Sequence, residues 1–174
     1  SVYASTYFKA SKAYMTATSN IIDEEKMGIV MQTVAGTRYG NRFYPSFSGV
    51  ARSINFYPLE PETPEDGVAN IALGLGKYIV DGGLSLHFSP KYPKRVLQTY
   101  SPEAALRETQ KYFYALDMNP EHFRANIDDG INILKLSVKE AEADGSLKWI
   151  ASTYDLQNGT LRDGVNYDGK KLIT

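Results

Sequence analysis

The chain has 174 residues, with 19 Lys and Arg against 20 Asp and Glu, so its formal net charge is −1. This balance lacks the basic excess that a nucleic-acid or acidic-membrane partner requires. Because there is no cysteine, disulfides, thiolate metal sites and a cysteine nucleophile are excluded, and a reducing, cytoplasmic location is expected. No apolar run reaches the roughly 18 residues of a membrane helix, so we expect no membrane partner.

Helical spacing is already under way at the first residues, and one face of this helix carries Tyr3, Tyr7, Ala10 and Tyr14. The helix is expected to end near Ser19–Asn20. At the other end, Gly169–Thr174 reads as a turn followed by the start of a strand. We therefore expect residues 1–174 to form a single partial domain truncated at both ends; a processed small protein is the alternative.

Three segments predict the strands of one sheet. Met27–Val34 is apolar on both faces, which is typical of a buried central strand. Phe47–Phe56 alternates between apolar and polar residues, and Val68–Leu73 is a further apolar run. Between the first two segments, Ala35–Tyr44 contains two glycines and reads as a loop.

The rest of the chain mixes helices and strands. Ser101 followed by Pro102 predicts a helix start, and the helical pattern continues to Asn119–Pro120. Further helices are expected at Lys77–Val80 and, capped by Ser137, at Val138–Ala143. Asn158–Gly159 predicts a two-residue hairpin turn. The remaining predicted strands are Leu84–Phe88, Arg95–Thr99, Ile131–Leu136, Leu147–Tyr154 and Thr160–Val165. The order is not a strict alternation of strands and helices, so we expect an α+β fold with a mostly antiparallel sheet and a few helices.

The strongest local motif is Gly74-Leu75-Gly76, which follows a predicted buried strand. It lacks the third glycine of a dinucleotide-binding loop, since position 79 is Ile. For a P-loop, the motif would need Gly at position 71 and Ser or Thr at position 78, which are Ile and Tyr here. Its backbone N–H groups could still contact an anion, and a plain strand-to-helix turn is the alternative. His87 and His122 have no metal-ligand spacing, so both are interpreted as structural or surface residues.

Three segments in this order resemble the nucleotide-binding domain of the pyruvate phosphate dikinase and phosphoenolpyruvate synthase family. They are the strand Val30-Met31-Gln32-Thr33-Val34, the segment Ser48-Gly49-Val50, and the box from Gly74-Leu75-Gly76 to Gly82. The family reads a valine-glutamine strand, then serine-glycine-valine, then a tryptophan-glycine-leucine-glycine-glutamate box. The resemblance covers about residues 1–90.

The resemblance implies the C-terminal subdomain of an ATP-grasp fold. It implies that the backbone of Met31, Gln32, Thr33 and Val34 contacts adenine, and that Gly74 and Gly76 border the same cleft. The parent enzyme would use ATP and magnesium to phosphorylate a histidine in another of its domains, and then pyruvate. A water dikinase acting on glucan and an antibiotic-phosphorylating relative stay open within the family.

The chain also departs from the family pattern. Lys77 stands where the family box has a glutamate, and Leu73 replaces the aromatic residue before the box. The resemblance places the phosphate-clamping cations, the metal carboxylates and the phosphorylated histidine outside these residues. We therefore assign no catalytic residue, and we expect the chain alone to be inactive and to hold no cofactor. The alternative function is a non-catalytic interaction or carbohydrate-binding domain with a Tyr-rich face.

Overall fold

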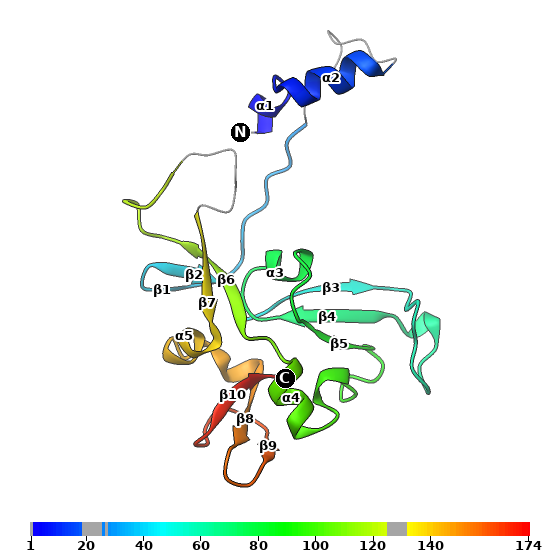
Figure 1. Ribbon diagram of the computed structural model, residues 1–174, viewed down its shortest axis with the longest axis vertical. Coiled ribbons are helices and arrows are strands. Elements are labelled where there is room, and N and C mark those ends of the chain that lie inside the picture. The colour runs from blue at the N-terminus through cyan, green and yellow to red at the C-terminus, as the bar shows by residue number, and fades with distance from the viewer. Residues whose placement is uncertain (1, 19–25, 27, 125–131) are drawn as a thin grey trace. The chain divides into compact units, whose positions relative to one another are not determined.

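The computed structural model describes residues 2–18, 26, 28–124 and 132–174 (Figure 1). The chain divides into two compact units. The first comprises Ser1–Val34 with Arg124–Ile131, and the second comprises Ala35–Phe123 with Asn132–Thr174. None of the described helices combines the length and apolar character needed to cross a membrane.

The first unit contains α1 (Val2–Ser5) and α2 (Lys9–Ala17) among its described residues. One continuous helix was predicted here, but Phe8 has an extended backbone, with φ −69° and ψ 149°, and separates the two. The predicted tyrosine face is not buried, because Tyr3, Tyr7 and Tyr14 are all largely exposed. The predicted helix end at Ser19–Asn20 lies outside the described residues.

The central strand predicted at Met27–Val34 is wrong for the part that the structure describes. Residues 28–34 form no strand and are exposed; Val30 and Met31 are 86% and 90% exposed. A segment that is apolar on both faces becomes a central strand only when neighbouring strands pair with it. The described residues of this unit contain no other strand that could do so.

The second unit contains three antiparallel sheets, with strand orders β1-β2-β6-β7, β3-β4-β5 and β10-β8-β9. Their strands are β1 (Thr37–Tyr39), β2 (Arg42–Tyr44), β3 (Ser48–Arg52), β4 (Val68–Ala72), β5 (Leu86–Phe88), β6 (Tyr112–Asp117), β7 (Ile133–Ser137), β8 (Ala151–Asp155), β9 (Thr160–Arg162) and β10 (Lys170–Ile173). The helices are α3 (Lys77–Val80), α4 (Pro102–Glu108) and α5 (Val138–Ala143), with 3-10 turns at Pro64–Asp66, Leu97–Thr99 and Ser146–Trp149. The α+β, mostly antiparallel fold is therefore confirmed.

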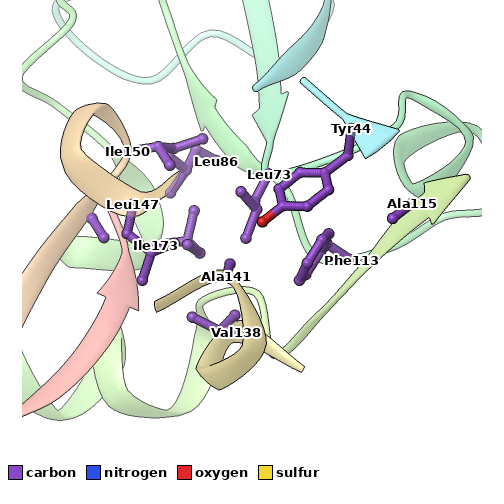
Figure 2. Packing of buried hydrophobic residues seen from close by; sticks show 11 residues of the cluster. Tyr44, Leu73, Leu86, Phe113, Ala115, Val138, Ala141, Leu147, Ile150 and Ile173 are labelled. Atoms are coloured by element: carbon purple, nitrogen blue, oxygen red, sulfur yellow. The ribbon is translucent and has the colours of Figure 1, made fainter. Parts of the chain in front are cut away.

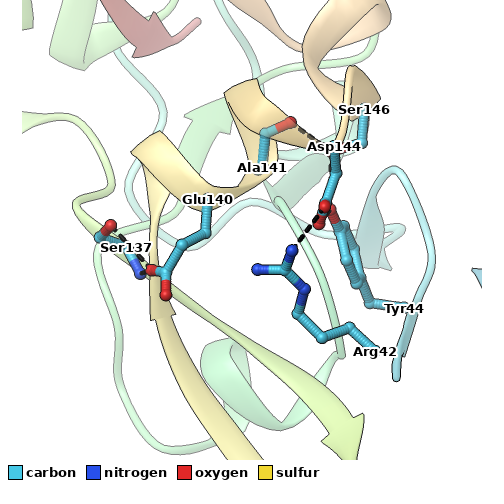
Figure 3. Close-up of polar contacts among 7 residues, drawn as sticks. All are labelled: Arg42, Tyr44, Ser137, Glu140, Ala141, Asp144 and Ser146. Carbon is cyan, nitrogen blue, oxygen red and sulfur yellow. Dashed lines mark hydrogen bonds and ion pairs between the residues drawn. The ribbon is translucent and has the colours of Figure 1, made fainter. Parts of the chain in front are cut away.

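Several local predictions are confirmed. The predicted strands at 47–56 and 68–73 appear as β3 and β4, which pair from Ser48↔Ala72 to Arg52↔Val68. Helix α3 has the predicted bounds. The Ser101 hydroxyl accepts a hydrogen bond from the Ala104 N–H and so caps α4. Ser137 and Glu140 form a capping box at the start of α5, drawn in Figure 3. In each case the signal is local, which explains why the sequence carries it.

The largest error concerns the helix predicted to run from Pro102 to Asn119–Pro120. Helix α4 ends at Glu108, and Tyr112–Asp117 forms β6 instead. Phe113 and Ala115 alternate into the core, and both are fully buried. The segment is rich in aromatic residues, which suit strands, and it pairs with β7 along one edge and β2 along the other. These long-range partners override its helical spacing.

Three further segments differ from their predictions. The loop predicted at Ala35–Tyr44 is the β1–β2 hairpin, in which Gly40 takes φ +60° at the first central position of the turn. The strand predicted at Arg95–Thr99 is a 3-10 turn. The hairpin at Asn158–Gly159 has a four-residue loop, because Asp155 pairs with Thr160 across it.

One buried hydrophobic core connects the three sheets (Figure 2). It receives Tyr44 and Phe113 from the first sheet, Leu86 from the second and Ile173 from the third. Leu73, which directly follows β4, is also fully buried in it. The sheets are therefore packed around shared apolar side chains, and burial of these side chains is the main stabilising contribution.

A polar cluster is joined to this core through Tyr44, which belongs to both (Figure 3). The Tyr44 hydroxyl donates to Asp144 Oδ2 at 2.7 Å and lies 2.9 Å from Ser146 Oγ. Arg42 Nη2 lies 2.7 Å from the other Asp144 oxygen. Burial raises the pKa of Tyr44 above the usual phenol range, and the Asp144 carboxylate contributes to the rise. Tyr44 therefore stays protonated and acts as a donor that joins β2 to the end of α5.

We expect Tyr44→Phe to lower the free energy of unfolding by about 1–3 kcal/mol, because it removes a donor from a largely buried carboxylate. Tyr39→Phe is the matched control, since the Tyr39 ring packs on Tyr44 but its hydroxyl has no hydrogen bond among the described residues. Urea unfolding of the two variants measures the difference. Equal losses in both would contradict a stabilising role for the Tyr44 hydroxyl.

Candidate functional site

The glycine motif forms a tight turn between β4 and α3. Gly74 has φ +83°, a conformation that L side chains rarely adopt. A Cβ atom on Gly74 would lie 2.7 Å from the Tyr114 carbonyl oxygen and 2.8 Å from the Phe113 ring. The next residue, Leu75, donates its N–H to the same Tyr114 oxygen at 2.9 Å. The turn therefore rests directly on the backbone of β6, and glycine is required at position 74.

The Gln110 side chain holds the strand that leads into this turn. Its Oε1 accepts from the Leu73 N–H at 2.8 Å, while its Nε2 donates to the carbonyl oxygens of Leu73, at 3.1 Å, and Tyr112, at 2.7 Å. Gln110 is only 3% exposed, so these bonds are shielded from water. On the other side, the Ser48 hydroxyl donates to the Gly74 carbonyl oxygen at 2.7 Å. The turn is thus fixed from both flanking sheets.

Gly76 differs from Gly74 in its backbone conformation and contacts, although the sequence predicted the same role for both. Its φ is −58°, which any residue can adopt, and a Cβ there would lie 3.7 Å from the Ser48 hydroxyl oxygen, an ordinary contact. Packing within the described chain therefore does not require glycine at position 76.

The residues after the turn contribute a charged and an aromatic group. Lys77, which replaces the family glutamate, lies 3.3 Å from Asp81 across one helical turn. Tyr78 packs edge-on against Tyr114, with ring centroids 6.0 Å apart, and its burial raises the pKa of its hydroxyl. Helix α3 is a single turn and offers no N-terminal anion site, and the Leu75 N–H is already bonded to Tyr114.

The structure brings Gly74 and Gly76 together in one turn, whereas Met31, Gln32, Thr33 and Val34 belong to the other unit. These four residues are exposed and belong to no helix or strand. Sequence reasoning missed Gln110 and Tyr114, which fix the glycine turn. It placed both in a helix, and only the pairing of β6 with its neighbours reveals their role.

The two histidines have structural partners, as predicted. His87 Nδ1 lies 3.0 Å from Asn70 Oδ1, on the neighbouring strand. His122 Nδ1 lies 2.8 Å from Asp117 Oδ2. The Asn119 N–H donates to the Asp117 carboxylate, and this is the main reason that the pKa of Asp117 is lowered. The hydrogen bond with His122 lowers it further. Within residues 2–18, 26, 28–124 and 132–174, no three acidic or histidine side chains are grouped as a metal site requires.

A model of a known protein family matches most of the chain. The family model described as pyruvate phosphate dikinase, AMP/ATP-binding domain, matches residues 1–137. The match includes both Met31–Val34 and the glycine turn. Searches of curated proteins and of solved structures found no significant match.

The two glycines are expected to respond differently to alanine. Gly74→Ala should lower the free energy of unfolding by roughly 1–3 kcal/mol or more, because the new Cβ meets backbone and the positive φ is strained. Gly76→Ala should change it by less than about 0.5 kcal/mol, as for other sites without strain. Thermal and urea unfolding of both variants provide the comparison. A large loss in Gly76→Ala would show that position 76 also serves packing.

Proposed function

The chain belongs to the family of pyruvate phosphate dikinase AMP/ATP-binding domains, and from this we propose that it positions ATP for phosphoryl transfer in a dikinase-type enzyme. The phosphoryl group would pass to a histidine in another domain of the parent enzyme and then to pyruvate. Support comes from the family match, which covers all six residues that the resemblance assigns to nucleotide contact. The α+β, mostly antiparallel architecture is consistent with an ATP-grasp-like domain.

Met31–Val34 would contact the adenine base. The segment lies in no helix or sheet ladder among the described residues, so its backbone N–H and C=O groups remain for a ligand. Met31 and Val34 are 90% and 47% exposed and would cover the faces of the base. An adenine edge presents one donor beside one acceptor, which an extended backbone can match.

Gly76 would lie beside the nucleotide, as the resemblance implies, and packing within the described chain does not require glycine at this position. Gly74 would act indirectly, by fixing the turn against Tyr114. Lys77 is a cation where the family has an acid, so no metal ligand is assigned to it. The acids and histidines that the structure describes are not grouped as a magnesium site requires.

Recognition through the base, without phosphate clamps, predicts a distinctive affinity pattern. We expect the chain to bind ATP weakly, to bind AMP within about threefold of the same Kd, and to respond little to magnesium, because clamping cations and metal carboxylates supply the polyphosphate affinity. Calorimetric titrations with ATP and AMP, with and without Mg²⁺, measure this pattern. Micromolar, magnesium-dependent binding of ATP alone would contradict it, and so would equal binding of a pyrimidine nucleotide.

Two variants separate the nucleotide roles from folding. Thr33→Pro removes one backbone N–H from the proposed adenine contact, and Gly76→Val fills the space beside the turn. Each should weaken AMP binding roughly tenfold or more, the loss expected for a ligand hydrogen bond or close approach, while the thermal midpoint stays near that of the unmodified chain. Ile29→Pro, in the same exposed segment but outside the proposed contact and outside any described helix or strand, is the control for proline in this region. Unchanged AMP affinity in both variants would remove these residues from the site.

One observation favours a second candidate, a carbohydrate-binding or interaction surface. Tyr3, Tyr7 and Tyr14 are 65%, 75% and 68% exposed in the first unit, and exposed aromatic rings suit sugar faces and protein partners. Glycan-array binding that disappears in Tyr7→Ala would support this candidate. An array on which the chain binds nothing would exclude the carbohydrate form.

A further inference from the structure

A pocket in the second unit is lined by four lysines. Lys111 precedes β6, Lys139 lies on α5, and Lys170 and Lys171 open β10. The pocket has a volume of about 550 Å³. Among its lining residues the single acid is Glu142, so the pocket carries a clear excess of positive charge.

The four ammonium groups are poorly neutralised by the chain itself. Lys171 Nζ lies 4.0 Å from Glu142 Oε1 and donates to the Tyr167 carbonyl oxygen. Lys111 Nζ donates to the Leu106 carbonyl oxygen at 2.5 Å. The side chains of Lys139 and Lys170 form no ion pair or hydrogen bond with any residue that the structure describes. Two cations are therefore available at the rim, next to two that neutral carbonyl groups hold in place.

The lysines also act on each other. Burial lowers the pKa of Lys111, and the positive charge of Lys170 lowers it further. Like charges at one pocket repel in the folded protein, so an anion bound between them would remove an unfavourable interaction as well as form new ones. An ammonium group is a common ligand for phosphate, to which it contributes a compact charge and several donors.

The pocket is not purely polar. Val138, Leu156 and Leu172 also line it, and Leu156 is 69% exposed. An apolar wall beside a cationic rim suits a ligand that has both an apolar body and an anionic group. An inorganic anion alone would use the rim and leave the wall uncovered.

We propose that this pocket binds a small phosphorylated organic metabolite, with its phosphate between Lys139 and Lys170 and its apolar part on Leu156. The proposal goes beyond nucleotide positioning and does not depend on it. Three of the four lysines, Lys139, Lys170 and Lys171, lie beyond the 1–137 segment that matches the nucleotide-binding family. The site would let a metabolite other than ATP bind this part of the enzyme.

The probes for the test are phenyl phosphate, inorganic phosphate and benzoate, titrated into the full chain by calorimetry. Phenyl phosphate should bind saturably, and roughly tenfold more tightly than either of the others, because it alone supplies both the dianion and the apolar ring. Lys139→Gln and Lys170→Gln should each weaken its binding roughly fivefold, as for loss of one charge-assisted contact. Both side chains lack partners in the described structure, so the variants should keep the thermal midpoint of the unmodified chain.

Two further variants sharpen the result. Lys148→Gln is the matched control, because Lys148 is an exposed lysine of the same unit that does not line this pocket. Its phenyl phosphate affinity should be unchanged. Leu156→Ala should weaken phenyl phosphate while leaving inorganic phosphate unaffected. The proposal is overturned if phenyl phosphate shows no saturable binding at millimolar concentration, if benzoate binds equally well, or if Lys148→Gln weakens binding as much as the pocket variants.

Discussion

The Gln110 carboxamide is the interaction on which the arrangement of the second unit depends. It joins both backbone groups of Leu73 to the Tyr112 carbonyl oxygen and lies almost wholly out of water. Leu73 directly follows β4 and Tyr112 begins β6, so one side chain couples two sheets. If this amide were absent, the two buried backbone groups of Leu73 and the part-buried Tyr112 carbonyl oxygen would lose this partner, and an unpaired buried group is costly. Leu73 and Phe113, which lie beside these hydrogen bonds, both belong to the shared core.

This junction also separates two roles within one short motif. Gly74 sits against Tyr114 and has a backbone that only glycine adopts readily, so its role is structural. Gly76 has an ordinary backbone, and a side chain there would make only ordinary contacts with Ser48, so packing does not explain this glycine. A rigid turn that carries an uncrowded glycine can present backbone to a nucleotide with little rearrangement, which is how positioning contributes to phosphoryl transfer.

The two proposed binding sites would rely on different interactions. The nucleotide site would rely on backbone groups and apolar cover from Met31–Val34, with little charge of its own. The lysine pocket would rely on charge, because Lys139 and Lys170 have no described counter-ion. The overall charge of −1 reveals neither site. Composition averages over the surface, whereas binding depends on which charges the fold brings together.

The sequence by itself determined the features whose causes are local: the caps at Ser101 and Ser137 and the apolar run of β4. It marked Gly74 and Gly76 alike, and only the contacts with Tyr114 and Phe113 show that position 74 requires glycine. The family could also be recognised from the sequence, because three short motifs in a fixed order can be read without a structure. The tertiary structure decided whether Tyr112–Asp117 is strand or helix, because that depends on pairing with distant strands. The tertiary structure also decided that residues 28–34 form no strand. Their apolar pattern predicts one, but no described strand pairs with them. Local signals act within a few residues, while sheet pairing and charge clustering depend on contacts that only the folded chain creates.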